Sequence, residues 1–209
     1  MKGEHDIQKT ISHEEINLLP LKSFSGKIVL ITEPKDLHKA FKEIKEHDVV
    51  GFDTETKPAF VKGQVHKVSL LQLAIPHKVF LIRLNFTGMD GEIIKFLENE
   101  KILKAGVGIR DDIKILHRLG RFTAGGFTEL SSMAREAGLE VESVKKLTAL
   151  LLGFRISKGA QTSNWEAANL NEKQVMYAAT DAWVCLEIYR KLIKMPPQES
   201  EGSLKQKRA

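Results

Sequence analysis

Acidic residues interrupt an otherwise apolar run in the first part of this 209-residue chain. The run is VVGFDTET, over residues 49–56, and its acids are Asp53 and Glu55. In a β-strand, side chains alternate between the two faces, so both carboxylates lie on one face while Phe52 and Thr54 point to the other. Two carboxylates on one patch repel each other unless one takes up a proton or a divalent cation binds them. The pair therefore indicates either a metal site or a strand end where the acids are exposed to water.

Another acidic position follows a glycine-containing strand exit in the segment GVGIRDDIKILHRLG. Steps of three, four and seven residues from Asp112 reach apolar residues, whereas the same steps from Asp111 include Lys114 and Arg118. We therefore expect a helix that begins near Arg110, with Asp112 on its inward face and Asp111 facing water. Acidic residues are common in a first helical turn because they interact well with the helix dipole, so this position alone does not define a site.

The last acidic position lies on the longest expected helix, near the C-terminal end of the chain. Asn171 is expected to cap this helix, with Gln174 completing a capping box. Asp181 interrupts the apolar stripe on its inward face, one turn after Tyr177. A buried carboxylate requires a basic partner, a proton or a metal ion. The stripe consists of Tyr177, Ala178, Asp181, Val184, Cys185, Ile188 and Leu192.

The order of the apolar patterns predicts the elements that must position these acids. Four β-rich runs come first, with an amphipathic helix over residues 36–47 between the first two, and helical patterns dominate after residue 84. An antiparallel start followed by alternating elements predicts an α/β fold, with a mixed sheet and helices on its faces. The expected strands are residues 27–32, 49–54, 68–74, 79–84 and 102–107.

Length and composition favour a single domain with tails. No apolar run approaches the roughly 20 residues of a membrane-spanning helix, and the first residues lack an apolar secretion signal, so we expect a cytoplasmic protein. Cys185 is the single cysteine, which excludes an internal disulfide. We expect a partly disordered extension over residues 1–24, a working domain over residues 25–195 and a disordered tail over residues 196–209. The net charge of +5 mildly favours a polyanionic partner.

The acidic motifs, taken in order, resemble those of the DEDD 3′-5′ exonucleases, in the subgroup with a tyrosine in the third motif (DEDDy). The motifs are Asp53-x-Glu55, Asp112 at a helix start and Tyr177-x-x-x-Asp181. The segments LLQLA, KAGVGI and SNWEAANLNEKQVMYAATDAW resemble ribonuclease D and, more strongly, the exonuclease domain of the Werner syndrome helicase. The resemblance extends over about residues 27–192. It implies a ribonuclease H-like fold, a five-stranded mixed sheet flanked by helices, with the first motif on the central strand.

The resemblance also implies a chemistry for these residues. Two divalent ions, Mg²⁺ or Mn²⁺, are expected at the four carboxylates, because oxygen ligands suit these hard cations. By this resemblance Asp53 would contact both ions. Glu55 and Asp181 would complete the site of one ion, and Asp112 would support the other. Tyr177 would orient the attacking water, and the expected product is a nucleoside 5′-monophosphate released from the 3′ end of a nucleic acid, with DNA favoured over RNA.

Basic and aromatic residues near the motifs are candidates to hold the substrate. Lys57, Arg155 and Lys158 could contact backbone phosphates, and Trp165 and Phe60 could stack on bases. Solvated loop charges and, for Trp165, packing in the core are the simpler interpretations.

Three alternatives to a DNA exonuclease share the expected fold. They are an RNA-specific ribonuclease D-like enzyme, a ribonuclease H-type endonuclease, and a binding or scaffold protein with little or no activity. All four acids and the tyrosine are present, which favours an active enzyme over a scaffold. The length leaves no room for a helicase motor or a polymerase, so we expect a standalone nuclease.

Overall fold

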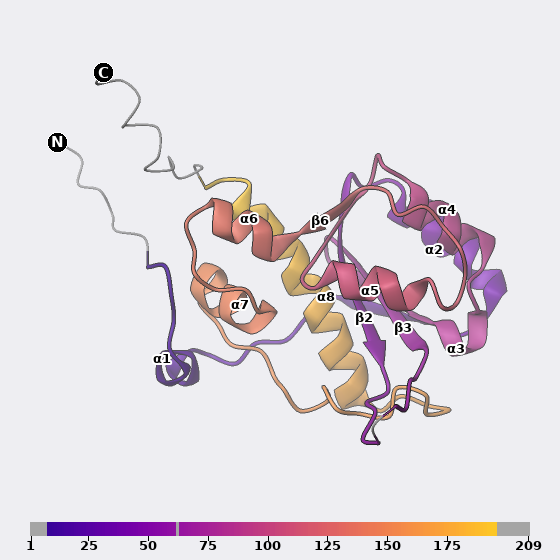
Figure 1. Ribbon diagram of the computed structural model, residues 1–209, viewed down its shortest axis with the longest axis horizontal. Helices are drawn as coiled ribbons and strands as arrows, with labels where there is room; N and C mark the ends of the chain where they lie inside the picture. Colours follow the sequence, from indigo (N-terminus) through magenta and orange to yellow (C-terminus); the bar gives the residue numbers. More distant parts are fainter. Residues whose placement is uncertain (1–7, 62, 196–209) are drawn as a thin grey trace.

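The computed structural model describes residues 8–61 and 63–195, and within them six strands form one mixed sheet. The strand order is β1-β4-β3-β2-β5-β6, so β2 lies inside the sheet, between β3 and β5 (Figure 1). The tail predicted to be disordered, residues 196–209, lies outside the described residues. The strands are β1 (Lys27–Ile31), β2 (Val49–Thr56), β3 (Val68–Ile75), β4 (Lys78–Arg83), β5 (Leu103–Gly106) and β6 (Phe127–Glu129).

The strand directions confirm the predicted α/β fold with a mixed sheet and correct its number of strands. β3 runs antiparallel to β2 and β4, whereas β1 pairs in parallel with β4, and β5 with β2. The described sheet has six strands rather than five, because β6 adds in parallel to β5. The three residues of β6, FTE, are too few for an alternating pattern to be recognised in the sequence.

Helices cover both faces of the sheet, because successive strand side chains point to opposite sides. The helices are α1 (His13–Leu18), α2 (Leu37–Ile44), α3 (Leu84–Thr87), α4 (Gly91–Glu98), α5 (Ile109–Leu116), α6 (Leu130–Glu136), α7 (Val144–Leu152) and α8 (Glu172–Leu192), with a 3-10 turn over Pro34–Asp36. On β3, Leu73 packs in the cluster that contains Phe41 of α2 and Phe96 of α4. Leu70, on the other face, packs in the cluster that contains Ala178 of α8. Figure 1 shows α2 and α4 on one side of the sheet and α6, α7 and α8 on the other.

No helix among the described residues combines the length and apolar character needed to cross a membrane.

Gly51 allows α8 to pack directly on β2. A Cβ atom at this position would overlap the carbonyl oxygen of Ala182 and would lie 2.9 Å from the backbone nitrogen of Leu186. Gly51 and Asp53 lie two residues apart on the same strand and so share a face of the sheet. The face that receives the α8 backbone is therefore the face that carries the first acid of the site.

The N-terminus and the inward face of α8 are as predicted. The Asn171 side chain accepts a hydrogen bond from the Gln174 backbone nitrogen at 3.0 Å, and the Gln174 side chain accepts one from the Asn171 nitrogen at 3.1 Å. This capping box fixes where the helix begins. Every member of the predicted stripe is buried, including Asp181, whose exposed fraction is 8%.

Residues 8–24, which the sequence assigns to a partly disordered extension, pack against the domain, whereas residues 1–7 lie outside the described part. The Lys22 backbone nitrogen donates to the Arg155 oxygen and the Arg155 nitrogen donates to the Pro20 oxygen, both at 2.9 Å. Phe24 is buried, and its backbone nitrogen donates to the hydroxyl of Thr180 on α8 at 3.0 Å. These contacts were not visible in the sequence because each joins residues far apart in the chain.

Candidate active site

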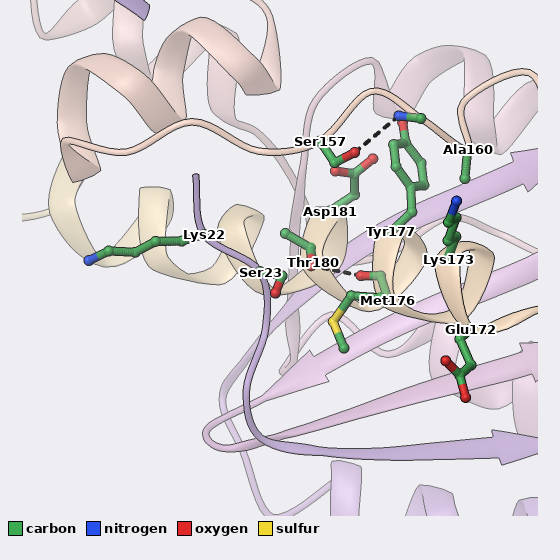
Figure 2. A pocket seen from close by; sticks show the side chains of 11 residues that line it. Lys22, Ser23, Ser157, Ala160, Glu172, Lys173, Met176, Tyr177, Thr180 and Asp181 are labelled. Carbon is green, nitrogen blue, oxygen red and sulfur yellow. Dashed lines mark hydrogen bonds between the residues drawn. The ribbon is translucent and has the colours of Figure 1, made fainter. Parts of the chain in front are cut away.

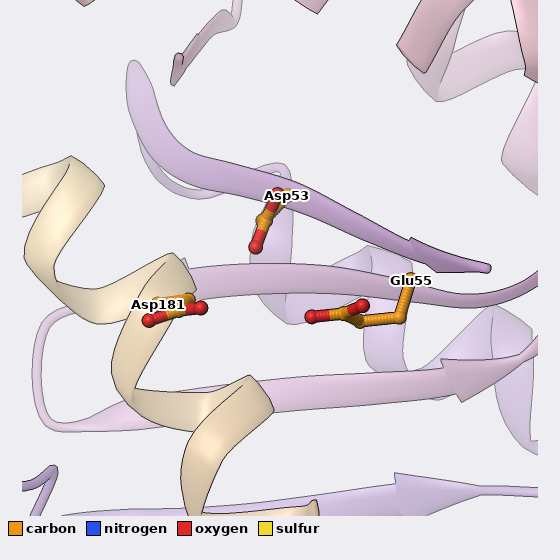
Figure 3. Close-up of side chains that lie close together, drawn as sticks. All are labelled: Asp53, Glu55 and Asp181. Atoms are coloured by element: carbon orange, nitrogen blue, oxygen red, sulfur yellow. The ribbon is translucent and has the colours of Figure 1, made fainter. Parts of the chain in front are cut away.

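Three carboxylates converge between β2 and α8. Asp53, Glu55 and Asp181 each offer one oxygen, and these oxygens all lie within 4.8 Å of one another. Figure 3 shows the side chains of Glu55 and Asp181 directed toward each other, with Asp53 above the space between them. Strand alternation places the first two acids on one face, and α8 brings the third to that face. The group thus joins the first and third motifs, as the sequence predicts.

Asp112, on α5, lies beside the same strand and contacts Thr54. The helix begins after Gly108, whose φ of 77° is accessible to glycine at little cost. Asp112 Oδ1 accepts a hydrogen bond from the Thr54 hydroxyl at 2.5 Å, and Thr54 lies between the two acids of β2. Asp111 is exposed. Asp112 is half-buried but does not belong to the group of three converging carboxylates, so its part in the site stays a prediction.

Glu129 was not identified from the sequence, although it holds the beginning of α5 in place. Its Oε2 atom accepts hydrogen bonds from the backbone nitrogens of Gly108 at 2.9 Å and Ile109 at 3.0 Å. These are unpaired donors of a helix start, and a carboxylate is a favourable partner for them. Because Glu129 lies on β6, the strand missed in the sequence, its connection to Asp112 could not be seen in the pattern.

The four acids lie in an environment that opposes their ionisation. Burial raises the pKa of Glu55 to about 9, and the charges of Asp181 and Asp112 add to this effect. Burial also raises the pKa of Asp112 to about 6, against the hydrogen bond from Thr54, and it raises the pKa of Asp53 well above its usual range. For Asp181 burial raises the pKa to about 6, against the hydrogen bond from Tyr177 and the charge of Lys145.

Among the described residues, no lysine, arginine or histidine forms an ion pair with any of these acids. Repelling carboxylates without a basic partner remain ionised together only if another cation neutralises them. Their donor atoms are all oxygens, which suit Mg²⁺ or Mn²⁺. The residues present therefore fit a site for divalent metal ions.

Tyr177 lies one turn before Asp181 on α8, with its ring against Trp165 at a centroid distance of 6.1 Å. Burial raises the pKa of the Tyr177 phenol, and the charges of Asp181 and Glu55 raise it further. The hydroxyl therefore stays protonated at neutral pH and acts as a hydrogen-bond donor beside the carboxylates.

Gln72 connects the first acid to α8. It is fully buried on β3 and pairs in register with Asp53. With its amide oriented to suit its neighbours, the nitrogen donates to Asp53 Oδ2 and to the Ala178 carbonyl oxygen, both at 3.1 Å. The sequence signal for this residue is a polar amide side chain inside the apolar run LLQLA. Gln72 thus fixes the orientation of the Asp53 carboxylate.

The predicted substrate-binding residues have different surroundings. Lys57, after β2, lies 3.4 Å from Glu166 Oε2 in an ion pair. Arg155 is half-buried, and its Nε atom donates to the Leu19 carbonyl oxygen at 3.1 Å. Lys158 is exposed in the turn before α8. Arg155 and Lys158 line one pocket together, whereas Lys57 lies apart from them.

The assignment of Trp165 as a base-stacking residue is corrected by the structure. Its exposed fraction is 0%, and it packs in the core against Tyr177 and α8. A side chain enclosed in this way has no free face for a base, so its role is to support the helix that carries Tyr177. Phe60, the other aromatic candidate, is 82% exposed in the loop after β2 and is therefore accessible to a base.

Comparison with known proteins gives concordant results. Residues 28–196 match a family profile described as 3′-5′ exonuclease. The chain is 34% identical, over 196 residues, to the bifunctional 3′-5′ exonuclease/ATP-dependent helicase WRN of Mus musculus, an overlap that covers 89% of this chain and 14% of that protein. It is 30% identical, over 181 residues, to ribonuclease D of Gluconacetobacter diazotrophicus, covering 84% of this chain and 44% of that protein. The chain thus spans less than half the length of either relative.

A solved structure agrees with the fold. The EXO domain of Aedes aegypti Nibbler superimposes with a TM-score of 0.73 and 23% sequence identity, over 83% of this chain and 92% of that domain. At this identity the likeness concerns the fold, which is that of the ribonuclease H-like exonuclease domains.

Proposed function

The chain belongs to the 3′-5′ exonuclease family, and from this membership we propose that it hydrolyses nucleic acid from the 3′ end with the help of two divalent metal ions. The observation that carries the proposal is the convergence of Asp53, Glu55 and Asp181 at one point, with Asp112 and Tyr177 beside them. Water would add to the phosphorus of the last phosphodiester, and the bond to the 3′ oxygen of the preceding nucleotide would break. The products are a nucleoside 5′-monophosphate and a strand with a new 3′-hydroxyl.

By the resemblance to the exonuclease family, the four carboxylates would hold two ions. Glu55 and Asp181, with Asp53, would hold one ion, and Asp112, with Asp53, would support the other. When bound, the ions would lower the pKa of the attacking water and offset negative charge on the reacting phosphate. Gln72 would keep the Asp53 carboxylate in the orientation that this shared contact requires.

Tyr177 acts on the water rather than on the metal. Its hydroxyl keeps its proton, because the pKa is raised by burial and by the neighbouring acids. It therefore cannot serve as the general base at neutral pH. We assign to it a hydrogen bond that orients the attacking water toward the phosphorus.

DNA is the substrate that we propose. Support comes from the 34% identity to the WRN protein, against 30% for ribonuclease D, whose name specifies RNA. No residue of the site identifies itself as a sensor of the ribose 2′-hydroxyl, which distinguishes the two substrates. An RNA-specific exoribonuclease is therefore the second candidate, and the relative named ribonuclease D favours it.

The activity is tested with an end-labelled single strand and Mg²⁺ or Mn²⁺. Wild type should produce a ladder of shortened strands, and Asp53→Asn should produce none. Asp111→Asn removes an exposed carboxylate one residue from the site and should leave the ladder unchanged. Equal ladders from wild type and Asp53→Asn would contradict the proposal.

Substrate type is tested by comparing matched DNA and RNA strands of one sequence. DNA should be degraded faster, and a clear preference for RNA would favour the second candidate. A circular single strand should remain intact, because it has no 3′ end. Cleavage of the circle would instead indicate an endonuclease.

A further inference from the structure

A pocket of about 380 Å³ with positively charged walls lies between α1, the N-terminal end of α7 and the segment before α8. Four basic side chains line it, together with polar groups of α1, and no Asp or Glu is among its lining residues. We call it the basic pocket. The lining residues that matter here are Lys145, Lys146, Arg155, Lys158, His13 and Asn17.

The fold builds this pocket by joining the N-terminal segment to the rest of the domain. Backbone hydrogen bonds connect residues 20–22 with Arg155, which holds α1 against the pocket. The guanidinium of Arg155 is fixed by its Nε bond to the Leu19 carbonyl at 3.1 Å. Within the described residues its terminal nitrogens have no hydrogen-bond partner. The pocket therefore contains preorganised donors, which suit the recognition of an oxyanion.

The basic side chains of this pocket form no ion pairs within the described part of the chain. Among the described residues none of the four has a carboxylate within ion-pair distance, whereas Lys45 and Lys78 on the other side of the sheet are paired with Glu92 and Glu43. Lys145 is half-buried, and its Nζ donates only to Gln161 Oε1, at 3.3 Å. Burial and the charge of Lys158 lower the pKa of Lys145, against the opposite effect of the Asp181 charge. A bound anion would offset the repulsion between Lys145 and Lys158.

The basic pocket borders a second cavity, a groove that reaches Asp181. This groove, of about 560 Å³, lies along α8 and is lined by Tyr177 and Asp181 as well as by residues 22–23. Ser157 lines both the groove and the basic pocket. Figure 2 shows Ser157 beside Asp181 and Tyr177, on the turn that passes over the N-terminal half of α8. A strand with its end at Asp181 would therefore pass Ser157 to reach the basic pocket.

We propose that the basic pocket binds a phosphate group of the same nucleic acid strand whose 3′ end occupies the active site. The proposal rests on the proposed exonuclease function and extends it with a second, sequence-independent contact. The phosphate is either an internal phosphodiester of a longer strand or the 5′-terminal phosphate of a short one. Both present the same oxyanion to the lysines. The N-terminal segment, through α1 and Arg155, is thereby part of the substrate-binding surface.

The test is binding of fluorescently labelled single strands in EDTA, measured by anisotropy at several salt concentrations. The double variant Lys146→Gln/Lys158→Gln removes two charges from the pocket and avoids Arg155, whose backbone holds the N-terminal segment. The control Lys39→Gln/Lys42→Gln removes two exposed charges from α2, on the opposite face. We expect the pocket variant to bind at least ~5-fold more weakly and its log–log salt slope to fall by about 0.7 for each phosphate that its pocket no longer neutralises, with no change in the control.

Equal affinities and salt slopes for the pocket variant and the control would overturn the inference. Thermal unfolding of both variants confirms that they are folded, which is expected because the substituted side chains contribute little to packing. A series of lengths with and without a 5′-phosphate identifies the source of the anion. If a 5′-phosphate strengthens binding of short strands to wild type but not to the pocket variant, the pocket takes the terminal phosphate. If added length alone gives the same gain, it takes an internal one.

The two proposals fail in different experiments. If wild type degrades strands and the pocket variant retains normal affinity and salt dependence, the proposed exonuclease function stands and the proposed role of the basic pocket is wrong. If wild type binds strands through the pocket but degrades none in Mg²⁺ or Mn²⁺, the proposed exonuclease function is wrong instead.

Discussion

Buried charged side chains in two regions of this molecule differ in whether other protein groups form favourable contacts with them. Lys104 of β5 is completely buried, yet its Nζ donates to the carbonyl oxygens of Phe96 at 3.2 Å and Asn99 at 2.6 Å. It also lies over the rings of Phe96 and Phe127, at 5.2 and 5.0 Å from their centroids. The acids between β2 and α8 have no basic partner among the described residues. A buried charge that the protein satisfies supports the structure, whereas one that it leaves unsatisfied indicates a missing ligand.

The largest expected effect comes from Glu55→Gln, which separates activity from stability. Activity should fall by at least ~10³-fold, because a metal ligand is removed and bound metal supplies several kcal/mol of transition-state stabilisation. The metal-free protein should nevertheless unfold at a higher temperature than wild type, because burial and the neighbouring acids make the Glu55 carboxyl costly to keep in the folded state. Exonuclease rates and thermal unfolding in EDTA measure the two effects. A variant that is less stable than wild type in EDTA would contradict the comparison.

Lys104→Ala should lower stability and leave activity unchanged, the opposite of Glu55→Gln. The free energy of unfolding should fall by ~3 kcal/mol, because two hydrogen bonds are removed and a cavity is left. Activity per folded molecule should be unchanged, since Lys104 belongs to the satisfied group. Urea unfolding gives the first quantity and the titrated initial rate the second. Lys104→Met retains most of the volume, so it should be less destabilised, and equal losses for the two variants would assign the whole effect to the charge.

Tyr177→Phe tests whether the tyrosine acts on the attacking water or on the metal ligands. The rate should fall by about 10²-fold, because the water loses its orienting hydrogen bond. Affinity for Mn²⁺, measured by calorimetry, should remain close to that of wild type, because the phenol is no metal ligand in this arrangement. A parallel loss of metal affinity would show that the tyrosine holds the carboxylates rather than the water.

The smallest expected effect is a pH dependence of stability in the absence of metal. The pKa of folded Glu55 is raised to about 9, and those of Asp112 and Asp181 to about 6. Unfolded carboxyls titrate at about 4, so the folded protein binds more protons above that pH. The contribution of these acids to stability is therefore full below about pH 4 and is lost as the pH rises toward 9.

Metal should reverse this trend, because the ligands must be ionised to bind it. The unfolding temperature of wild type in EDTA should fall by a few degrees more than that of Glu55→Gln between pH 5 and pH 9. Mn²⁺ should stabilise wild type more at pH 8 than at pH 6. Identical pH profiles for wild type and Glu55→Gln would remove the basis for this prediction.

Much of the fold and site could be predicted because it depends on local periodicity. Strand alternation at Asp53 and Glu55, and helical periodicity at Asp112 and Asp181, fixed the faces on which these side chains lie before the sheet was known. The capping box at the start of α8 is equally local.

What could not be predicted depends on contacts between distant segments. Glu129, in a strand of only three residues, contacts the backbone of Gly108. Residues 20–22 form backbone hydrogen bonds with Arg155, more than a hundred positions later. For Trp165 the sequence left base stacking and core packing both open, and the core encloses it. Its burial is decided by the helix that packs over it and not by its neighbours in sequence.

Direct backbone packing at Gly51 has a consequence for how this enzyme can change. The separation between the acids of β2 and that of α8 is set by two backbones in contact, and no loop takes part in it. The loop after β2 can therefore change in length or charge without altering the distance between the carboxylates. Changes confined to this loop would reshape the surface beside the acids and leave their convergence in place.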